Sequence, residues 1–422
     1  MKSSLPMGKT IAIVSIINAV ALGCVQLVHA TTCDQFRAPV WSYTTPRGTE
    51  LLFSGVTDPN GNLYWIEYQP GLGTQQLVSA RRDGSIRYRA EFERTSGERE
   101  LSGYAAWAGG FVLIATEDHH VRAFDANTGE LAWDTKVPGL DLGGQLTDTG
   151  AQVIVVVYGR ELTGLDLASG QKLWTHPGEA SVSTGSGDIF LTQRDAEGRT
   201  FLTRADSSGM DIWSEPARGY LAAVLRGEIP LVDSFAYGET DIVVHEGWWE
   251  LPYVHFDVVA GNDLGFMVAF THYGEGQLKS FSAEDASTIG EQTLSRGEPY
   301  GFWGSPLLTQ QHLLLIWQET APCPCLCHPT RFLQAKVSAW TTSAEQLFSC
   351  DLPNLGEASV GAVSLYSGSL VIGRHQYIST SCTQPGHAVV IEAYDVPGEE
   401  LAEDGWVVGW AGNPARTRRP VR

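Results

Sequence analysis

The residues with the most distinctive chemistry in this sequence are cysteines. Three of them lie in the segment Cys-Pro-Cys-Leu-Cys-His at 323–328, which ends in a histidine. Thiolates and imidazole are ligands that zinc and copper prefer, so one hypothesis is a metal site. The ligands are, however, closer together than the spacing of roughly two to four residues that is usual for zinc. An even number of cysteines in an exported chain favours disulfides instead. The six candidates are Cys33, Cys323, Cys325, Cys327, Cys350 and Cys382.

The position of these cysteines suggests a covalent clasp. The 323–328 segment lies in an enlarged loop between two expected strands, and Cys382 lies in the equivalent loop of the next unit. Equivalent loops of neighbouring repeats lie on the same side of a stacked array. We therefore expect a disulfide between these two loops, with the metal site as the alternative.

A second group of reactive side chains surrounds a tryptophan pair. His245, Glu246, Glu250 and His255 flank Trp248-Trp249, without the His-Glu-x-x-His spacing of a zinc helix. Together with Trp303, exposed tryptophans here could bind a sugar or a peptide. The alternative interpretation is an irregular loop with no ligand.

Motifs of common enzyme classes are missing. The sequence has no Gly-x-Ser-x-Gly elbow, no phosphate-binding loop and no dinucleotide glycine pattern. No pair of carboxylates is placed across an expected cleft, as glycoside hydrolysis would require. We therefore assign no catalytic residue, no cofactor and no bound metal.

The elements that must position all these residues come from an internal repeat. The segment Val121–Trp133 (VRAFDANTGELAW) returns as LTGLDLASGQKLW and again as LTRADSSGMDIW. The three final tryptophans follow one another at intervals of 41 and 39 residues. A period of about 40 residues is typical of stacked supersecondary units. The repeated positions are Asp125, Gly129, Trp133, Asp166, Gly170, Trp174, Gly209 and Trp213.

Each copy predicts a β-hairpin. Alternating residues form a strand, the aspartate starts a turn by bonding its own backbone, and the glycine supplies a left-handed conformation. The tryptophan then opens the returning strand. One hairpin cannot bury both of its faces, so neighbouring units must cover it.

These positions resemble the repeat of the pyrroloquinoline-quinone (PQQ)-like β-propellers, roughly Ala-x-Asp-x-x-Thr-Gly-x-x-x-Trp. The resemblance implies an all-β propeller of four-stranded antiparallel blades, with the tryptophan packed between adjacent blades. Weaker copies of the pattern give eight blades, or seven if the weak fifth unit is only a loop. It also implies that one blade is shared between the two ends of the chain.

The N-terminal segment predicts export. Lys2 and Lys9 precede an apolar run, and Val-His-Ala at 28–30 resembles a secretory cleavage site. Ala-Leu-Gly-Cys at 21–24 also resembles a lipoprotein box, which would lipidate Cys24, and an uncleaved anchor is a third alternative. The expected boundaries are a signal peptide at 1–30, a lead-in at 31–50, the propeller at 51–410 and a basic tail at 411–422. The protein is expected in the periplasm, at the outer membrane or outside the cell.

Charge restricts the class of partner. The formal net charge is −20, from 28 basic and 48 acidic residues among 422. Such a surface repels nucleic acid and anionic lipid headgroups. Contact with a membrane is therefore expected only through the N-terminal lipid or anchor.

Three functions fit these observations. The first is a non-catalytic protein-interaction scaffold of the bacterial envelope, because length and blade count are similar to those of the propeller lipoproteins of outer-membrane-protein assembly. The second is a secreted module that recognises carbohydrate or peptide. The third is a PQQ-dependent dehydrogenase, which the sequence disfavours because it has no adjacent cysteine pair. We favour a monomeric scaffold with a protein partner.

Overall fold

The computed structural model describes most of the chain between residues 33 and 399. The residues outside the description are 1–32, 47–48, 70–73, 94–102, 117, 140–144, 158–160, 184–186, 226–228, 235–242, 247, 252–257, 263–264, 273–274, 283, 286, 295–300, 323–329, 357, 378–386 and 400–422.

The described strands form eight four-stranded sheets, which we number in chain order and list from the inner to the outer strand. Sheet one contains β2 (Glu50–Thr57), β3 (Leu63–Gln69), β4 (Thr74–Ala80) and β5 (Ile86–Glu93). Sheet two contains β6 (Gly103–Ala108), β7 (Phe111–Thr116), β8 (His120–Asp125) and β9 (Leu131–Lys136). Sheet three contains β10 (Gln145–Asp148), β11 (Gln152–Val157), β12 (Glu161–Asp166) and β13 (Lys172–Pro177). Sheet four contains β14 (Ala180–Ser183), β15 (Ile189–Arg194), β16 (Thr200–Ala205) and β17 (Asp211–Ala217).

The second half of the chain continues this pattern. Sheet five contains β18 (Gly219–Leu225), β19 (Ile229–Ser234), β21 (Trp248–Leu251) and β20 (Val243–His245). Sheet six contains β22 (Val258–Asn262), β23 (Gly265–His272), β24 (Glu275–Phe281) and β25 (Thr288–Thr293). Sheet seven contains β26 (Gly301–Leu308), β27 (Leu313–Pro322), β28 (Thr330–Trp340) and β29 (Gln346–Asp351). Sheet eight contains β30 (Ala358–Tyr366), β31 (Ser369–Tyr377), β32 (His387–Asp395) and β1 (Trp41–Thr44).

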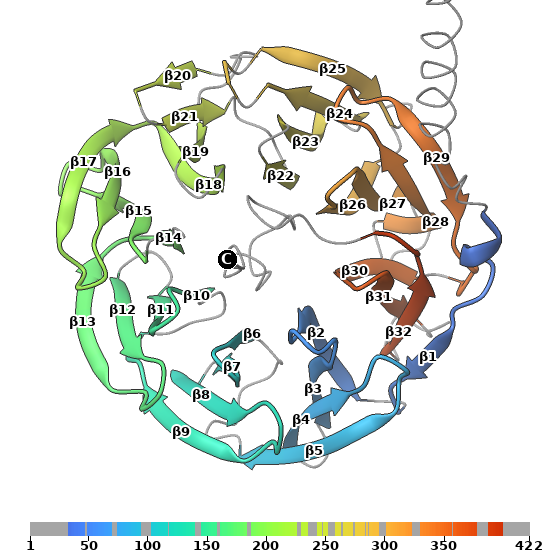
Figure 1. Ribbon diagram of the computed structural model, residues 1–422, viewed down its shortest axis with the longest axis horizontal. Helices are drawn as coiled ribbons and strands as arrows, with labels where there is room; N and C mark the ends of the chain where they lie inside the picture. Colours follow the sequence, from blue (N-terminus) through green and yellow to red (C-terminus); the bar gives the residue numbers. More distant parts are fainter. Residues whose placement is uncertain are drawn as a thin grey trace, which may run out of the picture.

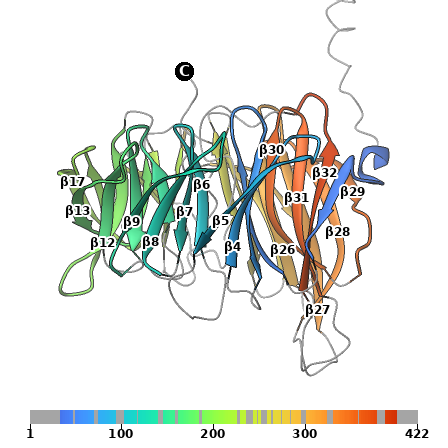
Figure 2. The same ribbon diagram turned by 90° about the horizontal axis from the view of Figure 1, so that it is seen from below.

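The sheets are arranged radially around a central axis, as in a propeller (Figure 1). In the order given above, the first strand of each sheet lies nearest the centre and the fourth lies on the outside (Figure 1). The strands run between two rims that carry the loops (Figure 2). The all-β propeller architecture predicted from the repeat is confirmed. No helix in the described part of the chain has the length and apolar character needed to cross a membrane.

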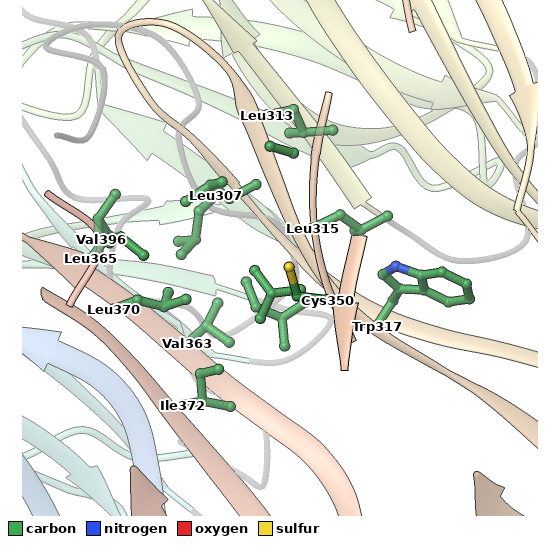
Figure 3. Close-up of a cluster of buried hydrophobic side chains, with 14 of the residues drawn as sticks. Leu307, Leu313, Leu315, Trp317, Cys350, Val363, Leu365, Leu370, Ile372 and Val396 are labelled. Atoms are coloured by element: carbon green, nitrogen blue, oxygen red, sulfur yellow. The ribbon is translucent and has the colours of Figure 1, made fainter. Parts of the chain in front are cut away.

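The core is divided among the junctions between sheets. One cluster joins sheets seven and eight and includes Leu315, Trp317, Leu370 and Ile372, all of them buried (Figure 3). Another joins sheets one and eight through Trp65 and Ile391. Because apolar side chains on both faces of a sheet need cover, each sheet is stabilised by its neighbours.

A β-bulge recurs between the third and the outer strand of six sheets. In sheet three, for example, Gly164 pairs with Trp174 and Leu165 with Lys172, so Leu173 is the extra residue. A bulge adds one residue to one strand and increases the local twist. The bulge changes the direction of the side chains that follow it, and the tryptophan side chain thereby points toward the next sheet.

Sheet five differs from the purely antiparallel arrangement that the resemblance implies. Its order is β18-β19-β21-β20, and β19 pairs with β21 in parallel. The repeat signature is missing from this stretch of the sequence. A short hairpin of β20 and β21 completes the sheet instead. The unit that could have been only a loop therefore forms a sheet.

The ring is closed by the N-terminal segment. Residues 41–44 of the expected lead-in form β1, which is the outer strand of sheet eight and pairs antiparallel with β32. This pairing brings the N-terminal segment and the last strand of the chain into one sheet. It also removes the open edge that β32 would otherwise present.

Candidate functional site

The aspartates of the repeat are occupied within their own turns. Asp125 Oδ1 accepts hydrogen bonds from the backbone N–H groups of Asn127 (2.8 Å) and Thr128 (2.9 Å). Asp166 Oδ1 accepts from both the hydroxyl (2.6 Å) and the backbone N–H (2.8 Å) of Ser169. These bonds favour the ionised form, and they lower the pKa of both carboxyls. Their role is to shape the turn.

The tryptophans connect each sheet to the next. Trp133 Nε1 donates to the backbone oxygen of Leu167 in sheet three at 2.9 Å. A Cβ atom on Gly170 would lie 2.5 Å from the Trp133 ring, and Gly170 has a φ of +71°. Glycine is therefore required there for both its conformation and the close approach. In the next junction Trp174 Nε1 donates to Ser207 O at 3.1 Å, and its ring lies over Gly209 in the same way.

The same contact occurs at two junctions where the sequence pattern was weak. Tyr88 occupies the tryptophan position of sheet one, lies over Gly129 and donates to Ala126 O at 3.1 Å. Burial raises the pKa of Tyr88 to about 12. Trp41 of β1 lies over Gly84 in sheet one. The weak DGSIRY copy at 83–88 was the available signal for Tyr88, whereas Trp41 lies far outside the repeat period.

Two positions break this pattern together. Gly290 of sheet six stands where the tryptophan is expected, and Ala344 of sheet seven stands where the turn glycine is expected, with a φ of +58°. A Cβ atom on Gly290 would lie only 2.0 Å from Ser343 O and 3.2 Å from the Ala344 methyl. The turn of sheet seven thus occupies the space that an indole ring fills elsewhere. Trp213, which precedes the atypical sheet five, packs against Phe190 of its own sheet.

A buried carboxylate connects β1 to sheet one. Glu67 accepts from Tyr43 Oη (2.6 Å), Trp65 Nε1 (2.9 Å) and Arg89 Nη1 (2.7 Å). Burial and the Glu67 carboxylate raise the pKa of Tyr43. Three donors thus satisfy this buried charge, and through Tyr43 the cluster connects β1 with sheet one.

One disulfide lies within the described residues. Cys33 of η1 (Cys33–Phe36) is bonded to Cys350 of β29. This pairing connects the N-terminal segment to sheet seven, and the sequence had left it open. The expected clasp between two loops lies outside the described residues, because one loop contains Cys323, Cys325 and Cys327 and the other contains Cys382. Cys24 and His328 also lie outside them.

The tryptophan pair of sheet five is not exposed, which excludes these two residues as the binding platform that was one of the two alternatives. Trp248 and Trp249 are 1% and 4% exposed. The His245 ring stacks on Trp248 at 3.7 Å, and Trp248 Nε1 donates to Glu215 of sheet four at 3.0 Å. Neither indole is therefore available as a binding surface.

The remaining residues of this group are partly described. Glu250 is buried, and its Oε2 lies 3.3 Å from His245 Nε2. Glu246 is exposed, His255 lies outside the described residues, and the side chain of Trp303 in β26 is not described. In the part of the chain that the structure describes, no three His, Cys, Asp or Glu side chains are grouped to hold a metal.

Comparison with known proteins identifies the repeat. Residues 58–221 match the family model described as outer membrane protein assembly factor BamB. A curated protein of that name from Nitrosomonas eutropha is 30% identical over 138 residues, which are 33% of this chain and 31% of that protein. The match thus spans about a third of the length of this curated relative.

Solved structures include propellers of very different sequence. BamB from Moraxella catarrhalis is 11% identical, with a TM-score of 0.47 over 83% of this chain and 100% of that one. The C-terminal WD40 domain of Sif2 is also 11% identical, with a TM-score of 0.54 over 86% of this chain and 100% of that one. The latter similarity shows a shared fold only. The chain is therefore an all-β propeller whose residues 58–221 are similar to the PQQ-like repeats of the outer membrane protein assembly factor BamB.

Proposed function

We propose that the protein is an exported, non-catalytic scaffold that binds another protein in the bacterial cell envelope and takes part in outer-membrane-protein assembly. The observation that carries this proposal is the match of residues 58–221 to the assembly-factor family. The site geometry is compatible with it, because the repeat carboxylates are engaged in turns and the repeat aromatics in junctions between sheets.

The finer architecture is part of the same proposal. The eight described sheets are the blades of one closed ring, and the ring acts as a monomer. The proposed division is a signal peptide at 1–30, a lead-in at 31–50 of which residues 41–44 join sheet eight as β1, a propeller at 51–410 and a basic tail at 411–422. Export places the ring in the periplasm or at the outer membrane, with lipidation of Cys24 as one means of attachment.

Among the residues that the structure describes, no group of carboxylates is placed to hold the calcium of a quinone cofactor. The sequence has no adjacent cysteine pair, and the carboxylates of Asp125 and Asp166 accept hydrogen bonds from their own turns. A calcium ion needs several free oxygen ligands that converge on one point. We therefore derive no step that uses such a cofactor.

A pull-down tests the scaffold proposal. The purified full-length mature protein, immobilised through a C-terminal tag, is incubated with detergent-solubilised envelope extract, and the bound proteins are identified by mass spectrometry. Recovery of a protein of the outer-membrane assembly machinery is expected. A matched bait that has been unfolded and blocked should not recover it.

Two further assays give the scaffold proposal a clear way to fail. Dye reduction after addition of pyrroloquinoline quinone and calcium is expected to stay at background. Quinone-dependent turnover, or an envelope pull-down with no assembly protein, would contradict the proposal.

A further inference from the structure

The turn between β4 and β5 of sheet one carries a concentration of positive charge. Between the end of β4 and the position that a tryptophan occupies in the repeat lie Arg81, Arg82 and Arg87, with Asp83 as the only acid. The equivalent segments of sheets two, three, four, six and seven contain one lysine and no arginine. That lysine lies 3.7 Å from a glutamate of its own sheet. In a chain with a net charge of −20, the turn of sheet one is therefore an exception among these six hairpins.

The fold uses the later arginines of this hairpin and leaves the first two free. Arg87 Nη1 donates to a backbone oxygen of sheet two at 3.2 Å, and Arg89 Nη1 donates to the buried Glu67 at 2.7 Å. Arg81 makes one long hydrogen bond, of 3.4 Å, to a hydroxyl of its own turn. The Arg82 side chain has no hydrogen bond or ion pair with the residues that the structure describes. Both guanidinium groups are exposed and thus available to a ligand.

The backbone of this turn is held from two sides. Within the turn, Arg81 N donates to Ser85 O at 2.8 Å and Gly84 N donates to Arg81 O at 2.9 Å. From sheet eight, the Trp41 indole N–H donates to Arg82 O at 2.6 Å, and the indole ring lies over Gly84. Because the backbone is already ordered, the conformational entropy lost on binding comes mainly from the two arginine side chains.

An aromatic ring lies next to the arginines. Trp41 is partly exposed, and β1 lies beside the β4–β5 hairpin on the outside of the ring (Figure 1). Tryptophan and arginine are among the residue types that contribute most to binding energy at protein interfaces. We call residues 81–85 together with Trp41 the arginine turn.

The arginine turn keeps a net positive charge. Its acid, Asp83, directs Oδ1 toward the N–H (2.9 Å) and the hydroxyl (2.6 Å) of Ser85, and these bonds lower the pKa of the carboxyl. The carboxylate therefore shapes the turn, while the two guanidinium groups remain unpaired with any carboxylate. Arginine binds carboxylates and phosphates through two parallel hydrogen bonds, so the expected ligand is an anion of this kind.

A short acidic peptide fits this surface better than a membrane does. Two arginines contribute about 2 kcal/mol of attraction to an anionic lipid surface, whereas lipid-binding clusters contain about four to eight. An extended membrane would also face many acidic residues of a chain with a net charge of −20. A short segment meets the turn alone, because charges more than about 8 Å away are largely screened at physiological ionic strength.

We propose that the arginine turn is a docking surface for an acidic segment of a partner protein. Carboxylates of that segment pair with Arg81 and Arg82, and a neighbouring apolar side chain packs on Trp41. The observation that carries this inference is a pair of guanidinium groups that the fold positions but does not use. The inference rests on the proposed protein-binding function, for which it names a surface and a class of partner segment.

A synthetic peptide tests the surface directly. The probe is fluorescein-labelled Gly-Asp-Phe-Glu-Leu-Asp-Gly, and its binding to the full-length mature protein is followed by fluorescence anisotropy. A second labelled peptide, Gly-Asn-Phe-Gln-Leu-Asn-Gly, keeps the shape of each side chain and removes its charge. The amide peptide is expected to bind about tenfold more weakly, and added salt should weaken binding of the acidic peptide.

Matched variants of the protein locate the site. The double variant Arg81→Ser, Arg82→Ser is expected to weaken binding of the acidic peptide about tenfold. The control, Arg194→Ser, Arg199→Ser, removes the same charge from exposed arginines of sheet four and should bind the peptide as the unaltered protein does. Since Trp41 bonds to the backbone of Arg82, the serine variant retains this contact.

Folding of the variants is checked separately. Circular dichroism and thermal unfolding establish whether both double variants are folded. If the serine variant of the arginine turn is not, the comparison of acidic and amide peptides on the unaltered protein provides the test.

Several results would overturn the proposal. These are no binding of the acidic peptide, equal binding of the amide peptide, equal binding by Arg81→Ser, Arg82→Ser, or equal weakening in the sheet-four control. Phosphatidylglycerol vesicles that bind the unaltered protein but not the serine variant, when the peptide does not bind, would instead assign the turn to a membrane.

The pull-down separates this inference from the scaffold proposal. If Arg81→Ser, Arg82→Ser recovers the assembly protein as well as the unaltered bait does, the docking surface is wrong and the scaffold stands. If no assembly protein is recovered but the peptides behave as expected, the scaffold fails and the docking surface stands.

Discussion

At the scale of single residues, aspartate, glycine and tryptophan each meet a different physical requirement. Asp166 supplies an acceptor for the N–H groups of its turn, and Gly170 supplies a left-handed conformation without a side chain. Trp133 of the preceding sheet covers that glycine, and its indole N–H donates a hydrogen bond to the backbone oxygen of Leu167. The repeat therefore encodes contacts between sheets as well as turns within them.

Removal of the Trp133 indole tests this contact. Trp133→Ala leaves a cavity between sheets two and three, and it is expected to lower the free energy of unfolding by about 3–5 kcal/mol. Urea denaturation measures the change. The control is Leu131→Ala on the same strand, which is 51% exposed and should change stability by no more than about 0.5 kcal/mol. Equal effects of the two variants would contradict the assigned role.

The turn aspartates predict a dependence on pH. The Ser169 hydroxyl and backbone N–H lower the pKa of Asp166 in the folded chain, so its contribution is present above the unfolded value of about 4. That contribution is lost as pH falls through the folded pKa. The difference in urea midpoint between the unaltered protein and Asp166→Ala should therefore shrink from pH 7 to pH 2. A difference that stays constant over this range would contradict the prediction.

At the scale of elements, the junctions rather than the strands determine which substitutions are tolerated. A recurrent bulge aims the residue at the tryptophan position toward the next sheet. Between sheets six and seven the same geometry holds Gly290 against the turn at Ala344. A large residue on one side of a junction is thus matched by a small one on the other.

This match makes a specific prediction for Gly290. A methyl group there would lie 2.0 Å from a backbone oxygen, which cannot move as a flexible side chain can. Gly290→Ala should lower the free energy of unfolding by about 1–3 kcal/mol, as measured by urea denaturation. Thr288→Ala on the same outer strand is the control and should have a much smaller effect. Unchanged stability of Gly290→Ala would show that the turn at Ala344 moves freely.

At the scale of the whole molecule, one short N-terminal segment connects three sheets. The disulfide joins η1 to sheet seven, β1 pairs within sheet eight, and Tyr43 bonds to Glu67 of sheet one. Phe36 adds an aromatic contact with Phe348 of sheet seven. Closure of the ring therefore depends on contacts between residues more than 300 positions apart.

Loss of the disulfide tests this closure. Cys33 and Cys350 are 317 residues apart, so their bond restricts a large part of the unfolded chain. The double variant Cys33→Ala, Cys350→Ala should be less stable by about 2–5 kcal/mol in urea without reductant. Limited proteolysis should also cleave it sooner within 33–45. As a control, reductant should lower the urea midpoint of the double variant less than it lowers that of the unaltered protein. Identical midpoints of the two proteins without reductant would contradict the prediction.

The sequence alone determined the repeating unit and the propeller architecture. Turn formation at Asp125 and Gly129 depends on residues two to four positions away, so it can be predicted from local chemistry. The period of the tryptophans then implied stacked sheets.

The tertiary structure decided which distant residues meet. Nothing local distinguishes Cys350 from the other cysteines as the partner of Cys33, or places Trp41 over Gly84. The burial of Trp248 and Trp249 and the exposure of Val243 and Val244 likewise depend on a parallel strand pairing that has no sequence pattern of its own. Such contacts are set by how the sheets close around the axis, because burial is a property of the assembled neighbours and not of the segment itself.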